Sequence, residues 1–140
     1  MGISKQAFYE GAALYLLART GGGAQIQFDR PFYVVNRHLR LFVKYSTKGR
    51  SPWGFTFSTE EQSLLKLTAS TKAIIIGLVC GADGVAALTY DDYVSIAMPR
   101  RSAIHIGCSR HHNQHYEISG PDGALNGKIP PSAWQKIFCS

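Results

Sequence analysis

Long apolar runs are absent from this 140-residue sequence. No segment reaches the roughly 20 consecutive apolar residues that a membrane-spanning helix needs. The N-terminal stretch also lacks a basic region followed by an apolar run, the pattern of a secretory signal peptide. We therefore expect no membrane partner and a cytoplasmic location.

Cysteine is scarce as well. The three cysteines, Cys80, Cys108 and Cys139, are an odd number and lie in no recognisable nucleophile motif. This usage fits a reducing compartment, in which the thiols serve as small core residues. Gly21-Gly22-Gly23 has no following Lys-Ser/Thr pair, so a phosphate-binding loop of the P-loop type is also excluded.

Acidic residues are outnumbered by basic ones. The chain has 9 Asp plus Glu against 15 Lys plus Arg, a formal net charge of +6 and a pI near 9.4. Such a balance favours binding to polyanions, and nucleic acid is the expected partner. An acidic protein partner and a merely solvated basic surface are the alternatives.

The composition is that of a globular protein, with 45% hydrophobic and 17% charged residues. A chain of this length is expected to form one domain over residues 1–140 with a single core. We see no repeat, no low-complexity tract and no linker that would divide it.

Hydrophobic periodicity and turn residues predict an α-β-β-β-α-β-β order over about residues 5–95. The expected helices cover residues 5–18 and 58–67, the second with a Ser58–Glu61 capping box. The expected strands cover residues 25–35, interrupted at residues 29–31, and residues 39–46, 53–57, 73–80 and 85–90. In the strand at 39–46, Leu41 and Val43 should face one way and Phe42 the other, and residues 81–84 should form a hairpin turn between the last two strands.

Residues 96–140 are predicted to form a β-rich extension with strands at 103–109, 115–118 and 124–129. Ser132 is expected to cap a final short helix that ends near Phe138. The fold class is therefore α+β, with a single mixed β-sheet flanked by helices and a C-terminal β-hairpin extension.

The first helix is apolar almost all the way round, so we expect it to be central in the fold. Its one acid, Glu10, shares a face with Ala13, Leu14 and Leu17. Burying that carboxylate is costly unless a metal, a hydrogen-bond donor or a cation meets it. Glu10 is therefore the first candidate site residue.

The order of a helix with Glu10, a strand with Asp29, a strand with Lys44, a helix and a strand resembles the core of the PD-(D/E)XK, or restriction-endonuclease-like, nucleases. The resemblance implies that Glu10 and Asp29 hold Mg²⁺ and that Lys44 positions or activates the attacking water. All three would be catalytic residues of a metal-dependent endonuclease.

One position departs from that family's pattern. Phe42 stands two residues before Lys44, where the family has Glu, Asp or Gln, and a phenyl ring cannot ligate magnesium. Either the alignment is displaced, another residue supplies the ligand, or the fold persists without cleavage. The structural alternatives are a turn role for Asp29, a solvent-reaching strand residue at Lys44 and a cation-paired buried acid at Glu10.

Four segments also look like a family of uncharacterised bacterial proteins, a resemblance that covers most of the chain and implies no function. They are residues 8–13, 44–48, 51–57 and 115–123.

Cations and aromatic residues alternate in the middle of the chain, the mixture that grips phosphates and stacks bases. The expected nucleic-acid-binding residues are Lys44, Tyr45, Lys48, Arg50, Trp53 and, from a later loop, Arg110. The alternative is that Trp53, Phe55 and Phe57 alternate into the core while the basic loop is solvated.

Histidines concentrate in one predicted hairpin. A zinc site there would draw on His105, Cys108, His111, His112 and His115. However, His105 and Cys108 should point to opposite faces of one strand, so a polar hairpin tip is the preferred interpretation.

Three functions follow from these patterns. We favour nucleic-acid binding, either with Mg²⁺-dependent cleavage or on a degenerate nuclease fold. The second is a non-enzymatic protein-interaction module that uses the same basic aromatic face. The third is metal-independent RNA cleavage by two hairpin histidines, with Arg110 or a lysine stabilising the phosphorane and Tyr116 assisting.

Overall fold

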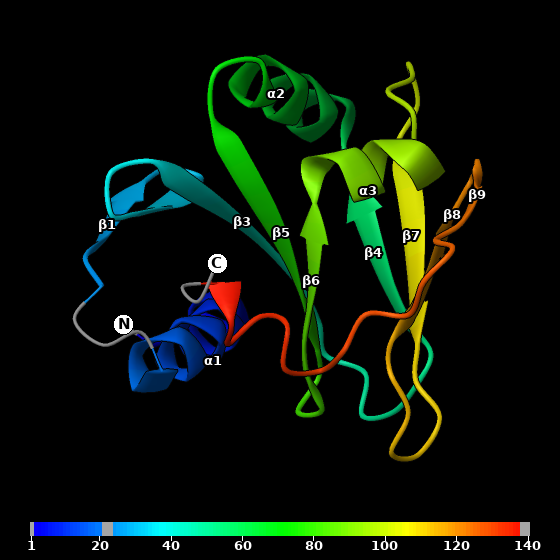
Figure 1. Cartoon of the computed structure of the whole chain (residues 1–140), viewed down its shortest axis with the longest axis horizontal. Helices are drawn as coiled ribbons and strands as arrows, with labels where there is room; N and C mark the ends of the chain where they lie inside the picture. The colour runs from blue at the N-terminus through cyan, green and yellow to red at the C-terminus, as the bar shows by residue number, and fades with distance from the viewer. Residues whose placement is uncertain (1, 21–23, 138–140) are drawn as a thin grey trace.

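The computed structural model describes residues 2–20 and 24–137, which form α-helices and two β-sheets (Figure 1). The elements in chain order are α1 (Lys5–Thr20), β1 (Ile26–Asp29), β2 (Phe32–Val35), β3 (Leu39–Ser46), β4 (Trp53–Phe57), α2 (Thr59–Ala69), β5 (Ala73–Cys80), β6 (Gly84–Thr89), α3 (Tyr90–Ile96), β7 (Ile104–Ser109), β8 (Glu117–Gly120) and β9 (Gly123–Ala124).

The first sheet has the strand order β1-β2-β3-β5-β6. Strands β3 and β5 run parallel, and the other neighbours are antiparallel, so the sheet is mixed. The apolar run in β5 places this strand between β3 and β6, with core on both of its faces. The expected α+β class with a mixed sheet is confirmed.

The second sheet has the order β4-β7-β8-β9 and is antiparallel throughout. Strand β4 pairs with β7, with Trp53, Phe55 and Phe57 buried and Gly54 and Thr56 exposed, the alternation of a strand with one face on the core. The predicted β-rich extension therefore does not append to one sheet; with β4 it builds a second sheet.

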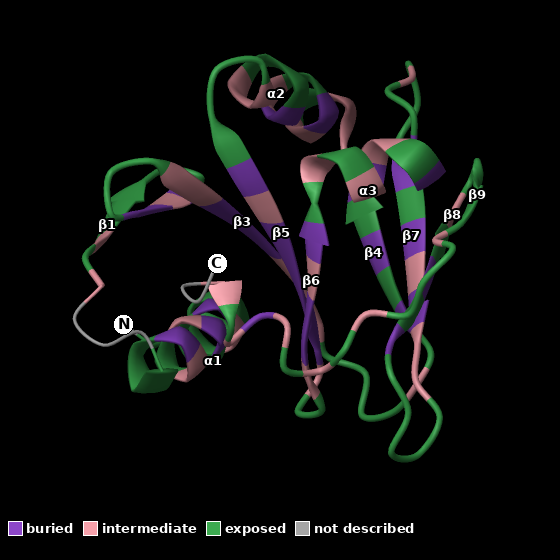
Figure 2. Ribbon diagram, viewed as in Figure 1, coloured by how far each residue is buried: buried purple, intermediate pink, exposed green. Residues whose placement is uncertain are grey.

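Three layers result from the alternation of side chains along the first sheet. Leu41 and Val43 of β3 face α1, whereas Phe42 faces a larger core shared with α2, α3 and the second sheet. Figure 2 shows buried residues along β3, β5 and β6 between these layers. The predicted division of β3 into two faces is confirmed.

Helix α1 is an outer layer, so its predicted central position is wrong. Only Glu10, Ala13 and Leu17 are buried, and Phe8 and Tyr15 are exposed. The sheet covers one side of the helix, and nothing in the described chain covers the opposite side.

The buried Trp134 closes one end of the α1 layer. Its indole N–H donates to the carbonyl of Ala13 at 2.9 Å. Gly77 of β5 lies under the ring, where a Cβ atom would come within 2.7 Å of it. The absence of a side chain at Gly77 therefore makes room for Trp134.

Two local predictions are wrong. Residues 90–96 form helix α3, capped by Thr89, where a strand end and loop were expected. Residues 131–137 form successive turns rather than a regular α-helix, and Phe138 lies outside the described residues. The Ser58–Glu61 capping box and the β5–β6 hairpin are confirmed. None of the described helices is long and apolar enough to cross a membrane.

Candidate nucleic-acid interface

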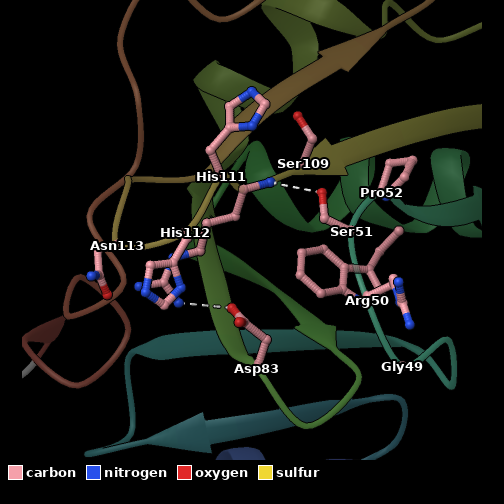
Figure 3. Close-up of a pocket in the computed structure, with 11 residues that line it drawn as sticks. Gly49, Arg50, Ser51, Pro52, Asp83, Ser109, His111, His112 and Asn113 are labelled. Carbon is pink, nitrogen blue, oxygen red and sulfur yellow. Dashed lines mark hydrogen bonds and ion pairs between the residues drawn. The ribbon is translucent and has the colours of Figure 1, made fainter.

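Three loops that are distant in the sequence meet around a pocket of about 790 Å³, which we call the basic pocket (Figure 3). They are the β3–β4 connection, the β5–β6 turn and the β7–β8 hairpin. The lining residues are Gly49, Arg50, Ser51, Pro52, Trp53, Asp83, Ser109, Arg110, His111, His112 and Asn113.

Arg110 ties the three loops together. Its backbone N–H donates to Ser51 Oγ at 2.9 Å, and its Nη1 donates to Asp83 Oδ2 at 2.9 Å. Its Nε also donates to the carbonyl of Gln114 at 2.7 Å. The hydrogen bond to Asp83 raises the pKa of the guanidinium, which stays charged. Arg110 is thus a structural clamp of the pocket.

Asp83 has a second donor in Tyr116. The buried phenol of Tyr116 donates to Asp83 Oδ2 at 2.7 Å, and the Arg110 guanidinium lies 5.4 Å from the ring centroid. Burial and the Asp83 carboxylate raise the pKa of Tyr116, so its proton stays on the phenol. At Gly84 a Cβ atom would lie 2.7 Å from the Tyr116 hydroxyl. This first position of β6 therefore needs glycine.

Two cations remain available to a ligand. Lys48 and Arg50 are exposed, and their charged groups form no hydrogen bond or ion pair within the described chain. Arg50 lines the pocket and Lys48 is two residues before it. The predicted basic loop is therefore free to contact phosphates.

The aromatic part of the predicted interface is absent from this surface. Trp53, Phe55 and Phe57 are only 3%, 2% and 0% exposed, so the predicted alternation into the core is the arrangement observed. The Trp53 indole N–H donates to the Lys48 carbonyl at 3.0 Å and thereby shapes the basic loop. Trp53 lines the pocket and fixes the basic loop, but its buried ring offers no face for base stacking.

The hairpin histidines divide into groups. His111 and His112 are exposed and line the basic pocket, opposite Arg50 and Ser51 in Figure 3. His105 lies on the outer face of the second sheet beside Thr56, whereas Cys108 points into the core. The predicted opposite orientation of His105 and Cys108 is confirmed. In the described chain, no three His, Cys, Asp or Glu residues are grouped so that they could hold a metal.

A second depression, of about 260 Å³, lies beside β3, and we call it the acidic cleft. It is lined by Gln6, Glu10, Pro31, Phe42, Val43, Lys44, Tyr45 and Glu61. Glu10 and Lys44, predicted to share a site, do line the same cleft. Glu61 joins them from α2; in the sequence it was recognised only as the acid of a capping box.

Every charge in the acidic cleft has an intramolecular partner. Glu10 Oε1 accepts from the Tyr33 hydroxyl at 2.6 Å and Oε2 accepts from Gln6 at 2.7 Å. Lys44 Nζ lies 2.9 and 3.0 Å from the two carboxylate oxygens of Glu61. Burial, reinforced by Glu10, raises the pKa of Tyr33 to about 12. Of the three partners expected for the buried Glu10 carboxylate, a metal, a cation or a hydrogen-bond donor, the structure supplies hydrogen-bond donors.

Asp29 does not line the acidic cleft. It is exposed at the end of β1 and lines a separate pocket with Arg37 and Arg40. Phe42 is buried in the larger core. The resemblance to nucleases implies Mg²⁺, but the residues as arranged do not fit it, because the predicted ligand Asp29 lies outside the cleft and Lys44 is paired with the Glu61 carboxylate.

The six predicted nucleic-acid-binding residues divide between the two sites. Arg50, Trp53 and Arg110 line the basic pocket, with Lys48 adjacent. The other two, Lys44 and Tyr45, line the acidic cleft, where Tyr45 stacks on Tyr9 with ring centroids 5.1 Å apart.

Comparison of the chain with protein-family models, with curated proteins and with solved structures gave no match.

Proposed function

We propose that this protein binds nucleic acid at the basic pocket and does so without metal-dependent cleavage. The observation that carries the proposal is the convergence of the exposed basic loop, with Lys48 and Arg50, on the hairpin tip with His111 and His112. Arg50 and the two histidines come from segments about sixty residues apart, yet they line one pocket, and Lys48 is two residues before Arg50. The net charge of +6 supplies a long-range attraction to a polyanion.

The pocket's chemistry suits a phosphate backbone. Lys48 and Arg50 offer unpaired cations, and Arg50 can bind a phosphate in two-pronged fashion. The exposed His111 and His112 can add hydrogen bonds to phosphate oxygens. With so few phosphate contacts, the affinity should be weak, and it should fall with added salt in proportion to the number of those contacts.

The protein-interaction alternative needs an apolar patch beside the basic loop. Trp53, which donates to the Lys48 carbonyl, is buried, so its ring offers no exposed apolar face beside the loop. The salt dependence of binding distinguishes the two functions, because an interface dominated by apolar contacts responds little to salt.

The test is fluorescence anisotropy with labelled single- and double-stranded DNA and RNA at low salt. We expect the wild-type protein to bind and Arg50→Ala to weaken binding about tenfold. Arg101→Ala is the matched control, since Arg101 is exposed, carries the same charge and lines none of the pockets described above. Equal losses in both variants would reduce the interaction to net charge and contradict a localised site.

The same samples test for cleavage when they are incubated with Mg²⁺, with Mn²⁺ or with EDTA. We expect intact nucleic acid in all three. Metal-dependent cutting that Glu10→Ala abolishes would contradict the proposal and restore the nuclease assignment. Cutting of RNA in EDTA that is lost in His111→Ala or His112→Ala would establish the histidine-dependent ribonuclease instead.

A further inference from the structure

Two buried thiols meet between the two sheets. Cys80 ends β5 of the first sheet and Cys108 lies in β7 of the second, strands that Figure 1 shows in different sheets. The Cys80 thiol donates to Cys108 Sγ at 3.7 Å, and the side chains are only 0% and 1% exposed. Neither thiol is in a disulfide. Two cysteines that are 28 residues apart in the sequence are therefore in contact within the core.

The contact is close to the geometry of a disulfide. Bonded sulfur atoms are about 2.0 Å apart, so the two sulfurs need to approach by about 1.7 Å. Rotation about the Cα–Cβ bonds can supply a movement of that size. Each cysteine is also paired on both sides within its sheet, Cys80 by β3 and β6 and Cys108 by β4 and β8. The two sheets therefore hold the thiols in reach of one another.

The thiol pair adjoins the framework of the basic pocket. The Cys80 carbonyl accepts from the Asp83 N–H at 2.9 Å, and Cys108 is two residues before Arg110. Asp83 and Arg110 form the ion pair of that pocket. Trp53, which lines the pocket, is the cross-strand neighbour of Cys108. A bond between the two sulfurs would therefore link the strands from which two of the pocket's loops begin.

Burial alone assigns no role to these cysteines, because free cysteine often serves as a small apolar core residue. The contact between the sulfurs is a separate observation, since packing does not require two thiols to touch. The hydrogen bond to Cys108 and burial raise the pKa of Cys80, so its thiol stays protonated at neutral pH. Protonated, buried thiols react slowly, and an oxidant reaches them when the core opens locally.

From this geometry we propose that Cys80 and Cys108 are a site of reversible disulfide formation by hydroperoxides. One cysteine, as its thiolate, attacks the O–O bond of hydrogen peroxide and becomes a sulfenic acid, while the departing hydroxide takes up the thiol proton and leaves as water. The second cysteine then attacks the sulfenic sulfur. The S–S bond forms, the S–O bond breaks, and the released hydroxide and the second thiol proton give another water.

Two thiols and one hydrogen peroxide thus yield one disulfide and two waters, with the sulfurs oxidised and the peroxide oxygens reduced. The inference does not depend on nucleic-acid binding, because it concerns other side chains and another chemistry.

The test is mass spectrometric mapping of disulfides after the folded, full-length protein is treated with hydrogen peroxide. Remaining thiols are alkylated in urea before digestion. We expect a Cys80–Cys108 link as the main product, with Cys139 recovered in its alkylated form. The chain oxidised in urea is the control for proximity, because all three cysteine pairings are open to it.

Two variants remove one thiol each. Cys108→Ala should abolish the disulfide within the folded chain, whereas Cys139→Ala, the matched control, should keep it. If Cys108→Ala fails to fold, the peptide map of the wild-type protein still decides between the pairings.

Urea unfolding shows whether the fold accommodates the bond. A cross-link over 28 residues restricts the unfolded chain, so we expect the oxidised protein to unfold at a urea concentration about 1–2 M higher than the reduced protein. Dithiothreitol should restore the lower midpoint and both thiols.

Three results would overturn the proposal. No Cys80–Cys108 link in the folded protein, under conditions that oxidise the chain in urea, would show that the thiols are core residues only. Conversion of either cysteine to a sulfinic acid without a disulfide would exclude the pairing step. A disulfide that lowered the urea midpoint would show that the bond forms only by distorting the core.

Discussion

The acidic cleft and the basic pocket contain similar numbers of charged residues, but they use them differently. In the cleft, Glu10 is held by Tyr33 and Gln6, and Lys44 is held by Glu61. At the basic pocket, Arg110 is paired with Asp83, while Arg50 and the adjacent Lys48 have no ion-pair partner in the described chain. Paired charges hold the fold together, whereas unpaired ones are available to a ligand.

In both sites, the type of a charged residue did not by itself predict which contacts it makes. Glu10 and Lys44 fit a nuclease pattern by type and position, yet their partners give them a structural role here. Arg110 was predicted to bind nucleic acid; in the structure its guanidinium bonds Asp83 and Gln114 and its backbone N–H bonds Ser51, so the residue joins three loops. The role of a charged residue in either site therefore depends on which donors and acceptors the fold brings to it.

The largest effect should come from removing the clamp of the basic pocket. Asp83→Ala leaves the fully buried Tyr116 hydroxyl and the Arg110 guanidinium without their shared acceptor. We expect the free energy of unfolding to fall by about 2–3 kcal/mol in urea. A matched change at Asp122, which pairs with Arg100 elsewhere on the surface, should cost less. Equal losses would mean that Asp83 has no special part in holding the loops.

A smaller effect, dependent on pH, is expected in the acidic cleft. Burial raises the pKa of Tyr33 in the fold to about 12, above its ordinary value of 10.0, so the folded protein holds that proton more tightly. The associated stability is fully present below pH 10 and is lost as the pH rises towards 12. Because Tyr33 is partly exposed, we expect this loss to be about 1 kcal/mol.

Tyr33→Phe should remove that part of the pH dependence. Comparing urea unfolding of wild type and variant between pH 9 and 12 isolates it from the other buried tyrosines, whose pKa values are also raised. If the free energy of unfolding depended on pH in the same way in both proteins, the raised pKa of Tyr33 would not contribute to stability.

The smallest effect should follow from Lys44→Met, which removes the Lys44–Glu61 pair. Both side chains are partly exposed, 22% and 29%, so we expect a loss of only about 0.5–1 kcal/mol. Nucleic-acid affinity should not change, because Lys44 lies in the cleft. A marked loss of binding in this variant would show that nucleic acid also occupies the acidic cleft.

Local patterns in the sequence predicted local structure well. The alternation of Leu41, Phe42 and Val43, the capping box at Ser58 and the hairpin turn before Gly84 all appear in the structure. Each of these depends on neighbours a few residues away. Helix α3 was missed because Thr89 reads equally well as the end of a strand and as a helix cap.

The candidate sites depended on contacts that the sequence does not encode locally. The pairing of β4 with β7 brings Ser51 to Arg110 and thereby creates the basic pocket. Glu61 was recognised as a cap, but its salt bridge with Lys44 needs α2 to pack over β3. The prediction that Trp53 stacks on bases depended on its exposure, which was decided by which face of β4 met the core.

The salt dependence of nucleic-acid affinity tests the central claim most directly. It would be measured by anisotropy with one single-stranded oligonucleotide, for wild type and for Lys48→Ala/Arg50→Ala. We expect the slope of log affinity against log salt to become shallower by about 1.5 in the double variant, since two phosphate contacts are lost. An unchanged slope with unchanged affinity would show that the unpaired cations of the basic pocket do not bind nucleic acid.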